Sequence, residues 1–270
     1  MDSALIGCGF IGGLIAEHVA SGRLPIRLRL LLDRHEDKVK RIQDLFKEPP
    51  GAAHAIEDII SSNVDLVVEA ASIGAVQSFA EPILSSGKDM MIMSVGAFSD
   101  TRFYKRVEEL CMEKDVKVYL PSGAIGALDA VSSASEGRLR EVELSTIKNP
   151  VSLKGAPYVI KHGIDLSEIK KPTVIFQGNA AEAIEGFPAN VNVAVTLSLA
   201  GMGVGKTRVR IIADPSAKRN IHEVRAKGDF GELFFRTENI PSPDNPRTSV
   251  LAALSAISTL KKITRPVKIG

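Results

Sequence analysis

The segment Gly7-Cys8-Gly9-Phe10-Ile11-Gly12 decides the fold of this chain, because its three glycines have the spacing of a dinucleotide-binding turn. The apolar residues Ala4–Ile6 before it predict a short buried strand, and the apolar residues after it recur at helical spacing. In such a turn Gly7 allows the sharp bend, Gly9 lets the backbone approach a pyrophosphate, and Gly12 lets the helix pack closely against the strand. The free N–H groups at the start of the helix then face the phosphates.

A second predicted strand, Leu28–Leu32, ends at Asp33, at about the twenty-residue spacing that a ribose-binding carboxylate needs. Asp33 favours NAD because it accepts from the ribose hydroxyls and repels a 2′-phosphate, whereas Arg34 could pair with that phosphate and make NADP usable. The alternative interpretation is a glycine-rich structural turn with no ligand. The residues that we expect to contact the cofactor here are Gly7, Gly9, Phe10, Ile11, Gly12, Asp33 and Arg34.

Composition limits the kind of protein this can be. The 270 residues suffice for one large domain or two modest ones, and the net charge is only +2. The basic residues are scattered rather than interleaved with aromatics, which argues against a nucleic-acid partner. No apolar run reaches membrane-spanning length and no secretory signal is visible, so we expect a cytoplasmic protein without a membrane partner. Cys8 and Cys111 are expected to be reduced packing residues.

The rhythm of the predicted elements divides the chain. Up to residue 120, strands and helices alternate as in βαβ units, which predicts a Rossmann doubly wound parallel sheet. From about Glu141 onward the strands are closer together and alternate polar with apolar residues, which predicts an α+β domain of mostly antiparallel sheet. We therefore expect an α/β protein with a dinucleotide-binding domain at 1–120 and 244–270 and a substrate and dimerisation domain at 121–243. The strands expected in the second domain are Glu143–Ile147, Thr173–Gln177, Thr207–Ala213, Ile221–Ala226 and Glu232–Thr237.

The segment Ala200–Thr207 fits a relaxed P-loop pattern, but its context is wrong. A P-loop follows a strand and opens a helix, so that its amides converge on phosphate. Here an apolar helix precedes the loop and a strand follows it. We interpret the glycines as a helix end and a turn.

Three segments in the second half could carry chemistry, and each has a structural alternative. The glycines of Pro121–Gly126 permit close approach to a flat ligand such as nicotinamide, or they form a plain crossover between domains. Asn190, near the start of an apolar helix, could bind a carboxamide or cap the helix. His222 has the side chain best suited to accept a proton near neutral pH, although a lone histidine is more often structural. The histidines and cysteines show no metal-ligand spacing.

With these segments in view, the chain resembles the L-aspartate dehydrogenase family over nearly its whole length. The resemblance implies that His222 is the active-site residue and that Ala124 and Asn190 contact the nicotinamide cofactor. It also implies L-aspartate as substrate, a homodimer, and the supply of iminoaspartate for NAD synthesis. The matching stretches are Gly7–Gly12, Pro121–Gly126 with Leu128–Ala130, Phe187–Ala194, Asn220–Glu223 and Asn245–Ser249.

Other interpretations stay open at this point. A homoserine dehydrogenase and a dihydrodipicolinate reductase share the expected layout, although the paired-histidine segment of the latter is not found. A protein that senses NAD without turnover is a rival of a different class. The two carboxylates of an aspartate need cationic or amide partners. Lys148 and Lys171 stand near strand ends, but we expect them to be solvated surface lysines and assign neither.

Overall fold

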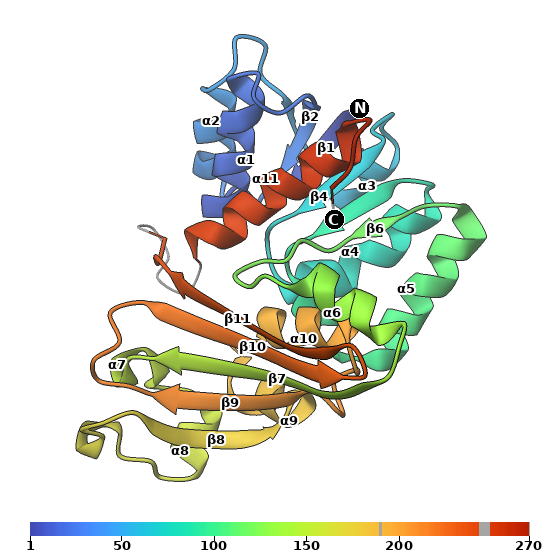
Figure 1. The fold of residues 1–270 in the computed structure, drawn as a ribbon. Helices are drawn as coiled ribbons and strands as arrows, with labels where there is room; N and C mark the ends of the chain where they lie inside the picture. The colour runs from blue at the N-terminus through green and yellow to red at the C-terminus, as the bar shows by residue number, and fades with distance from the viewer. Residues whose placement is uncertain (189–190, 243–248, 270) are drawn as a thin grey trace. The chain divides into compact units, whose positions relative to one another are not determined.

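The computed structural model describes residues 1–188, 191–242 and 249–269, and the chain divides into two compact units (Figure 1). Unit 1 comprises Met1–Pro121 and Ala253–Gly270, and unit 2 comprises Ser122–Ala252. The point at residue 244 where we expect the chain to return to the first domain lies outside the described residues.

Unit 1 is built on a six-stranded sheet with the order β3-β2-β1-β4-β5-β6, in which every pairing is parallel. This order confirms the predicted Rossmann sheet. Successive strands are added to one side of β1 up to β3 and to its other side from β4 onward, so a crevice opens at the carboxyl ends of β1 and β4. The strands are β1 (Asp2–Ile6), β2 (Arg27–Leu32), β3 (Gly51–Ala52), β4 (Leu66–Glu69), β5 (Asp89–Ile92) and β6 (Val118–Tyr119).

The central strands are apolar without alternation because both of their faces are buried. Leu66, Val67 and Val68 of β4 are 0% exposed, as is expected of a parallel strand covered on both sides. Capping residues fix where two of the flanking helices begin: Ser72 caps α4, and Asp100 caps α5. The helices of unit 1 are α1 (Phe10–Ala20), α2 (Glu36–Gln43), α3 (Ile56–Ile60), α4 (Ile73–Ser85), the 3₁₀ helix η1 (Val95–Ser99), α5 (Thr101–Lys114) and most of α11 (Val250–Thr264).

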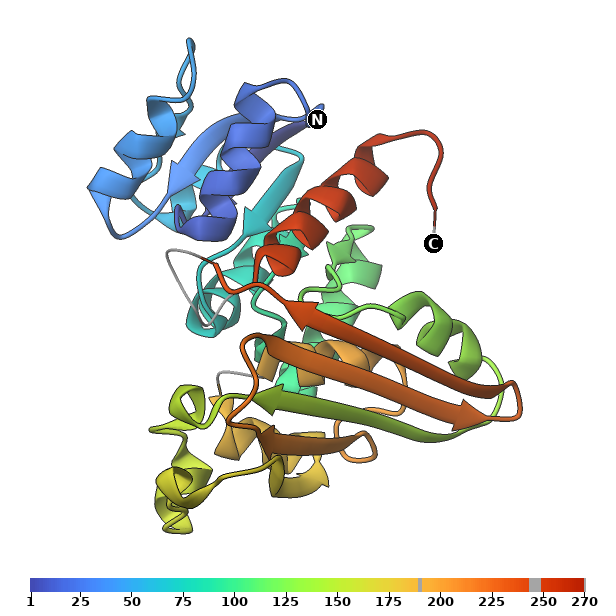
Figure 2. The ribbon, with the colours of Figure 1, turned by 60° about the vertical axis from the view of Figure 1, so that its left-hand side comes forward.

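Unit 2 is built on a five-stranded sheet with the order β11-β10-β7-β9-β8. Three of its pairings are antiparallel and only β7–β9 is parallel, which confirms a mostly antiparallel sheet. Figure 2 shows β10 between β11 and β7. The strands are β7 (Leu139–Lys148), β8 (Thr173–Asn179), β9 (Arg208–Ala213), β10 (Asn220–Gly228) and β11 (Gly231–Asn239).

The two faces of this second sheet differ in character. One face packs against α9 (Ala180–Gly186) and α10 (Val191–Ala200) and forms the core of the unit, with Leu144 and Ile211 buried in it. The opposite face carries ion pairs between neighbouring strands, such as Glu143–Arg210. Because side chains alternate along a strand, the apolar residues of these strands face the helices and the charged residues face the opposite side of the sheet.

The structure adds short elements that the sequence analysis does not anticipate. Two of them begin with a proline at the first helical position, where its missing N–H and fixed φ are tolerated. The added elements of unit 2 are α6 (Leu128–Ser135), α7 (Pro150–Leu153), α8 (Pro157–Lys161) and the 3₁₀ helix η2 (Leu166–Glu168).

The loop with the relaxed P-loop pattern follows α10 and precedes β9, as predicted. Gly203 has a φ of +79°, and its N–H donates to the carbonyl of Ser198 in the last turns of α10 at 2.8 Å. The loop therefore ends a helix. Within the described part of the chain, no helix has both the length and the apolar character to cross a bilayer.

Candidate active site

The glycine-rich turn joins β1 to α1 and leaves the start of that helix without a side-chain cap. Gly9 is the N-cap residue, so no side chain there accepts from the first amides of α1. Gly7 has a φ of +97°, and a Cβ there would lie 2.5 Å from the carbonyl oxygen of Ala70. A Cβ at Gly12 would lie 2.0 Å from the carbonyl oxygen of Gly7, whereas one at Gly9 would meet no atom within 4 Å. Packing thus requires glycine at two positions, and the third leaves space for a ligand beside a helix N-terminus.

A cleft of about 670 Å³ opens beside this turn, past the carboxyl ends of β1, β2 and β4. This volume is in the range of cofactor sites. Gly7, Gly9, Asp33 and Arg34 line the cleft, so the structure brings together four of the predicted cofactor residues. The other three predicted residues of the turn form the first turn of α1: Phe10, Ile11 and Gly12.

Asp33 ties the end of β2 to the glycine-rich turn. One carboxylate oxygen, Oδ2, accepts from the backbone N–H of Cys8 at 2.7 Å, and Oδ1 accepts from that of His35 at 2.9 Å. Arg34 beside it is exposed. Burial, and secondarily the charge of Asp33, raises the pKa of the Cys8 thiol to about 12, so Cys8 stays a protonated packing residue.

Glu69, at the carboxyl end of β4, is a buried carboxylate that joins two loops. Its Oε1 accepts from the N–H groups of Ala71 and Ser72 after β4, at 2.7 and 2.9 Å, and from the hydroxyl of Ser94 at 2.8 Å. Its Oε2 accepts from the N–H groups of Met93 and Ser94 after β5, at 3.2 and 2.9 Å. Burial raises the pKa of Glu69, while these hydrogen bonds oppose that shift. Because every partner is a donor, the arrangement suits the ionised carboxylate and fixes one wall of the cleft.

His222 lies in unit 2, on β10, and faces the helix-covered side of the sheet. It is 4% exposed, and its Nδ1 is 3.0 Å from the hydroxyl oxygen of Thr146, its partner across the β7–β10 pair. Burial, and to a smaller extent the positive charge of Lys148, lowers the pKa of His222 from 6.5 to about 3. The imidazole is therefore neutral at neutral pH, which is the form that accepts a proton.

Ala124 is fixed to the same sheet through its carbonyl oxygen. That oxygen accepts from the Thr237 hydroxyl at 3.2 Å and from the Asn239 side-chain amide at 3.0 Å, both on β11. The Thr237 hydroxyl also lies 3.5 Å from the carbonyl oxygen of His222, its partner in the β10–β11 pair. One threonine thus contacts both Ala124, a predicted nicotinamide contact, and His222, the predicted catalytic residue. Asn190, the other predicted nicotinamide contact, lies outside the described residues.

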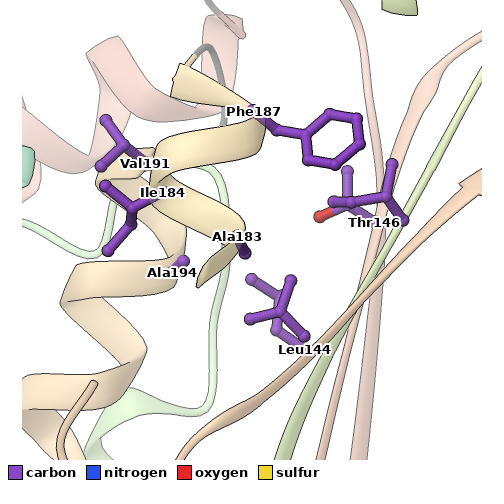
Figure 3. A pocket seen from close by; sticks show the side chains of 9 residues that line it. Leu144, Thr146, Ala183, Ile184, Phe187, Val191 and Ala194 are labelled. Carbon is purple, nitrogen blue, oxygen red and sulfur yellow. The ribbon is translucent and has the colours of Figure 1, made fainter. Parts of the chain in front are cut away.

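A small cavity beside Thr146 is too small to be the substrate site. Figure 3 shows Leu144 and Thr146 of β7 facing Ala183, Phe187 and Ala194 on the helical side. Its volume is about 10 Å³, which is room for one water at most.

Lys148 departs from the expectation that it is a solvated surface lysine. It is only 7% exposed, because alternation along β7 turns it to the helix-covered face together with Thr146. Lys171 is exposed, as expected. No cluster of three or more His, Cys, Asp or Glu side chains that could hold a metal ion occurs in the described ranges.

Comparisons with known proteins match both units. Residues 129–263 match the family model "Aspartate dehydrogenase, C-terminal", and residues 7–121 match "Homoserine dehydrogenase, NAD binding domain". The chain is 48% identical to an L-aspartate dehydrogenase of Methanosarcina barkeri over 98% of each chain, and 42% identical to one of Methanocaldococcus jannaschii over the same share. The chain belongs to the L-aspartate dehydrogenase family. The crystal structure of aspartate dehydrogenase from Thermotoga maritima has a similar fold, with a TM-score of 0.77 and 33% identity over 100% of this chain and 99% of that one.

For this member of the L-aspartate dehydrogenase family, sequence reasoning missed two features of the candidate site. The sequence analysis does not single out Glu69, although a glutamate inside an apolar strand is itself a signal, since a buried carboxylate needs several donors. Thr146 gave no signal, because its contact with His222 depends on the register between two strands 76 residues apart.

Proposed function

We propose that this chain is an L-aspartate dehydrogenase that oxidises L-aspartate to iminoaspartate with NAD, after which water converts the product to oxaloacetate and ammonia. The observation that carries this proposal is the identity of 48% to a curated L-aspartate dehydrogenase over 98% of each chain. The placement of His222 supports it, because oxidation of an amine needs a group that takes a proton, and this imidazole is buried with its Nδ1 3.0 Å from the Thr146 hydroxyl.

The residues around the glycine-rich turn fit NAD. Gly9 leaves space for a pyrophosphate where the amides of α1 begin, and Asp33 lies in the cleft where the adenosine ribose would bind. We assign cofactor contacts to Gly7, Gly9, Phe10, Ile11, Gly12, Asp33 and Arg34. When bound, NAD accepts the hydride from the substrate Cα.

His222 takes the proton in this proposal. It accepts from the substrate ammonium, or from the water that attacks the imine, while Thr146 fixes the orientation of its ring through Nδ1. Nε2 is then the nitrogen that faces the substrate. The net reaction releases iminoaspartate, reduced cofactor and one proton.

Ala124 and Asn190 are proposed to contact the nicotinamide. The assignment of Ala124 is supported by its position, because Thr237 and Asn239 of the strand next to that of His222 donate hydrogen bonds to its carbonyl oxygen. For Asn190 the support is the family resemblance of the segment that contains it.

We also propose a cofactor range, a location, an oligomeric state and a metabolic role for the protein, from the family resemblance and from Arg34. NADP is usable because the exposed Arg34 can pair with a 2′-phosphate. The protein acts in the cytoplasm, as a homodimer, and its iminoaspartate feeds NAD synthesis.

The test is reduction of NAD by the purified protein with L-aspartate, followed by the same assay with NADP. D-Aspartate, L-glutamate and L-homoserine are the controls. We expect turnover with L-aspartate alone, faster with NAD than with NADP. Tight NAD binding without turnover of any amino acid would favour the sensor instead, and turnover of L-homoserine would favour a homoserine dehydrogenase.

A further inference from the structure

The cofactor cleft of unit 1 carries a half-buried lysine that the proposed function does not use. Lys38 lies in the first turn of α2 and lines the cleft beside the glycine-rich turn. We propose that Lys38, together with Arg34, binds the 2′-phosphate of NADP. This inference rests on the proposed function, whose cofactor site it extends.

The turn from β2 into α2 brings Lys38 to the same part of the cleft as Asp33. Asp33 follows the last residue of β2, and the backbone N–H of Lys38 donates to the carbonyl oxygen of His35, the N-cap residue of α2, at 3.1 Å. Asp33, Arg34 and Lys38 all line this cleft. Because the adenosine ribose would bind at Asp33, a phosphate on its 2′-oxygen would lie next to these side chains.

The ammonium of Lys38 is available to a ligand. Among the residues that the structure describes, no ion pair includes Lys38, whereas Lys40 of the same helix pairs with Asp44 at 3.2 Å. The charge of Lys38 also acts at the glycine-rich turn: burial and the charge of Asp33 raise the pKa of the Cys8 thiol, and Lys38 is one of two cations that oppose this rise. The ammonium therefore lies on the cleft side of α2.

The charges that line the cleft favour a phosphate. Apart from histidines, the charged residues of its lining are one carboxylate, Asp33, and two cations, Arg34 and Lys38. The two acidic residues at the start of α2, Glu36 and Asp37, line a neighbouring hollow and not this cleft. A phosphate dianion at the ribose thus meets more positive than negative charge.

The hydrogen bonds of Asp33 weaken its repulsion of such a phosphate. Both carboxylate oxygens already accept from backbone N–H groups, those of Cys8 and His35, and these donors offset part of the negative charge. The remaining charge of Asp33 keeps NAD the preferred cofactor, while Lys38 and Arg34 make NADP usable. NAD has an uncharged hydroxyl at this position, so its binding does not depend on Lys38.

The test compares Lys38→Met and Lys38→Arg with the control Lys40→Met, which removes the charge of a lysine on the same helix that does not line the cleft. Methionine keeps the apolar stem of lysine, and arginine keeps its charge. For each protein the Kd of NADP and the Kd of NAD are measured by titration calorimetry at constant pH and ionic strength, together with the thermal unfolding temperature. The two ligands differ only in the 2′-phosphate, so the ratio of their Kd values isolates its contribution.

We expect Lys38→Met to raise the Kd of NADP by at least about tenfold, as loss of a charged hydrogen-bond partner does, and to leave the Kd of NAD within about threefold. Lys38→Arg should recover most of the NADP affinity, and Lys40→Met should change neither Kd by more than about threefold. The unfolding temperatures of all three variants should stay near that of the unaltered protein.

A Kd of NADP within about threefold of the unaltered value in Lys38→Met would overturn the proposal. Equal losses of NAD and NADP affinity would overturn it too, since they would place Lys38 at the pyrophosphate, which both cofactors share. An equal loss in Lys40→Met would show a general effect of charge and would also count against it, as would an unaltered protein that binds NAD but not NADP. If the expected Kd pattern is found but the unaltered protein does not oxidise L-aspartate, the proposed function fails and the assignment of Lys38 stands.

Discussion

Lowering the pH from about 7.5 to about 5 is expected to destabilise this protein through the imidazole of His222. Burial, and secondarily Lys148, lowers the pKa of His222 in the folded protein from 6.5 to about 3. Between these two values the unfolded chain binds a proton that the folded chain does not. The contribution of His222 to stability is therefore complete above pH 6.5 and is lost as the pH falls toward 3. At pH 5 this linkage amounts to about 2 kcal/mol.

The assay is urea unfolding followed by far-ultraviolet circular dichroism at both pH values and constant ionic strength. The matched variant is His222→Gln, which keeps a partner for Thr146 and removes the titrating group. All other titrating groups are shared, so the difference between the two proteins isolates His222. The unaltered protein should lose about 2 kcal/mol more than the variant between the two pH values. Equal losses would refute the assignment of a buried, neutral imidazole.

Three further predictions concern unit 1. Gly9→Ala should unfold at the same temperature as the unaltered protein, because the added Cβ meets no atom of the protein. It should bind NAD at least about tenfold more weakly, because that Cβ fills the space for the pyrophosphate. Gly12→Ala, in contrast, should lower the unfolding temperature, because its Cβ would lie 2.0 Å from a backbone oxygen. Equal effects at the two positions would contradict these distinct roles. Asp33→Ser should reduce the preference for NAD over NADP by roughly tenfold, as read from the two values of kcat/KM, because it removes the charge that repels a 2′-phosphate. Glu69→Gln should lower the free energy of unfolding, measured in urea, by about 3 kcal/mol, since the amide N–H₂ of glutamine would face N–H donors. An unchanged urea midpoint would show that the fold does not need the carboxylate.

The parts of the fold that the sequence predicted are those set by local patterns. The glycine-rich turn, the apolar strands and the reversed order around the P-loop-like segment all follow from residues that are neighbours in the chain. The bounds of α5 are local in the same way, because Asp100 caps its start and Asp115 in the left-handed conformation ends it. The short helices that start at Pro150 and Pro157 could have been found from the same kind of signal.

The parts that could not be predicted depend on contacts distant in sequence. The donors around Glu69 come from its own loop and from a loop 24 to 25 residues away. The burial of Lys148 depends on which face of β7 the helices cover, and the contact between His222 and Thr146 depends on strand register. Residue type alone favours a surface position for a lysine, and tertiary packing overrides it here.

The central claim is that His222 carries out the proton transfer in oxidation of L-aspartate by NAD. The most direct test is the initial rate of L-aspartate-dependent NAD reduction by the unaltered protein and by His222→Ala, measured together with the Kd of NAD for both. We expect His222→Ala to lose about 10²- to 10⁴-fold in kcat while its NAD affinity stays unchanged. Turnover by His222→Ala at the rate of the unaltered protein would contradict it.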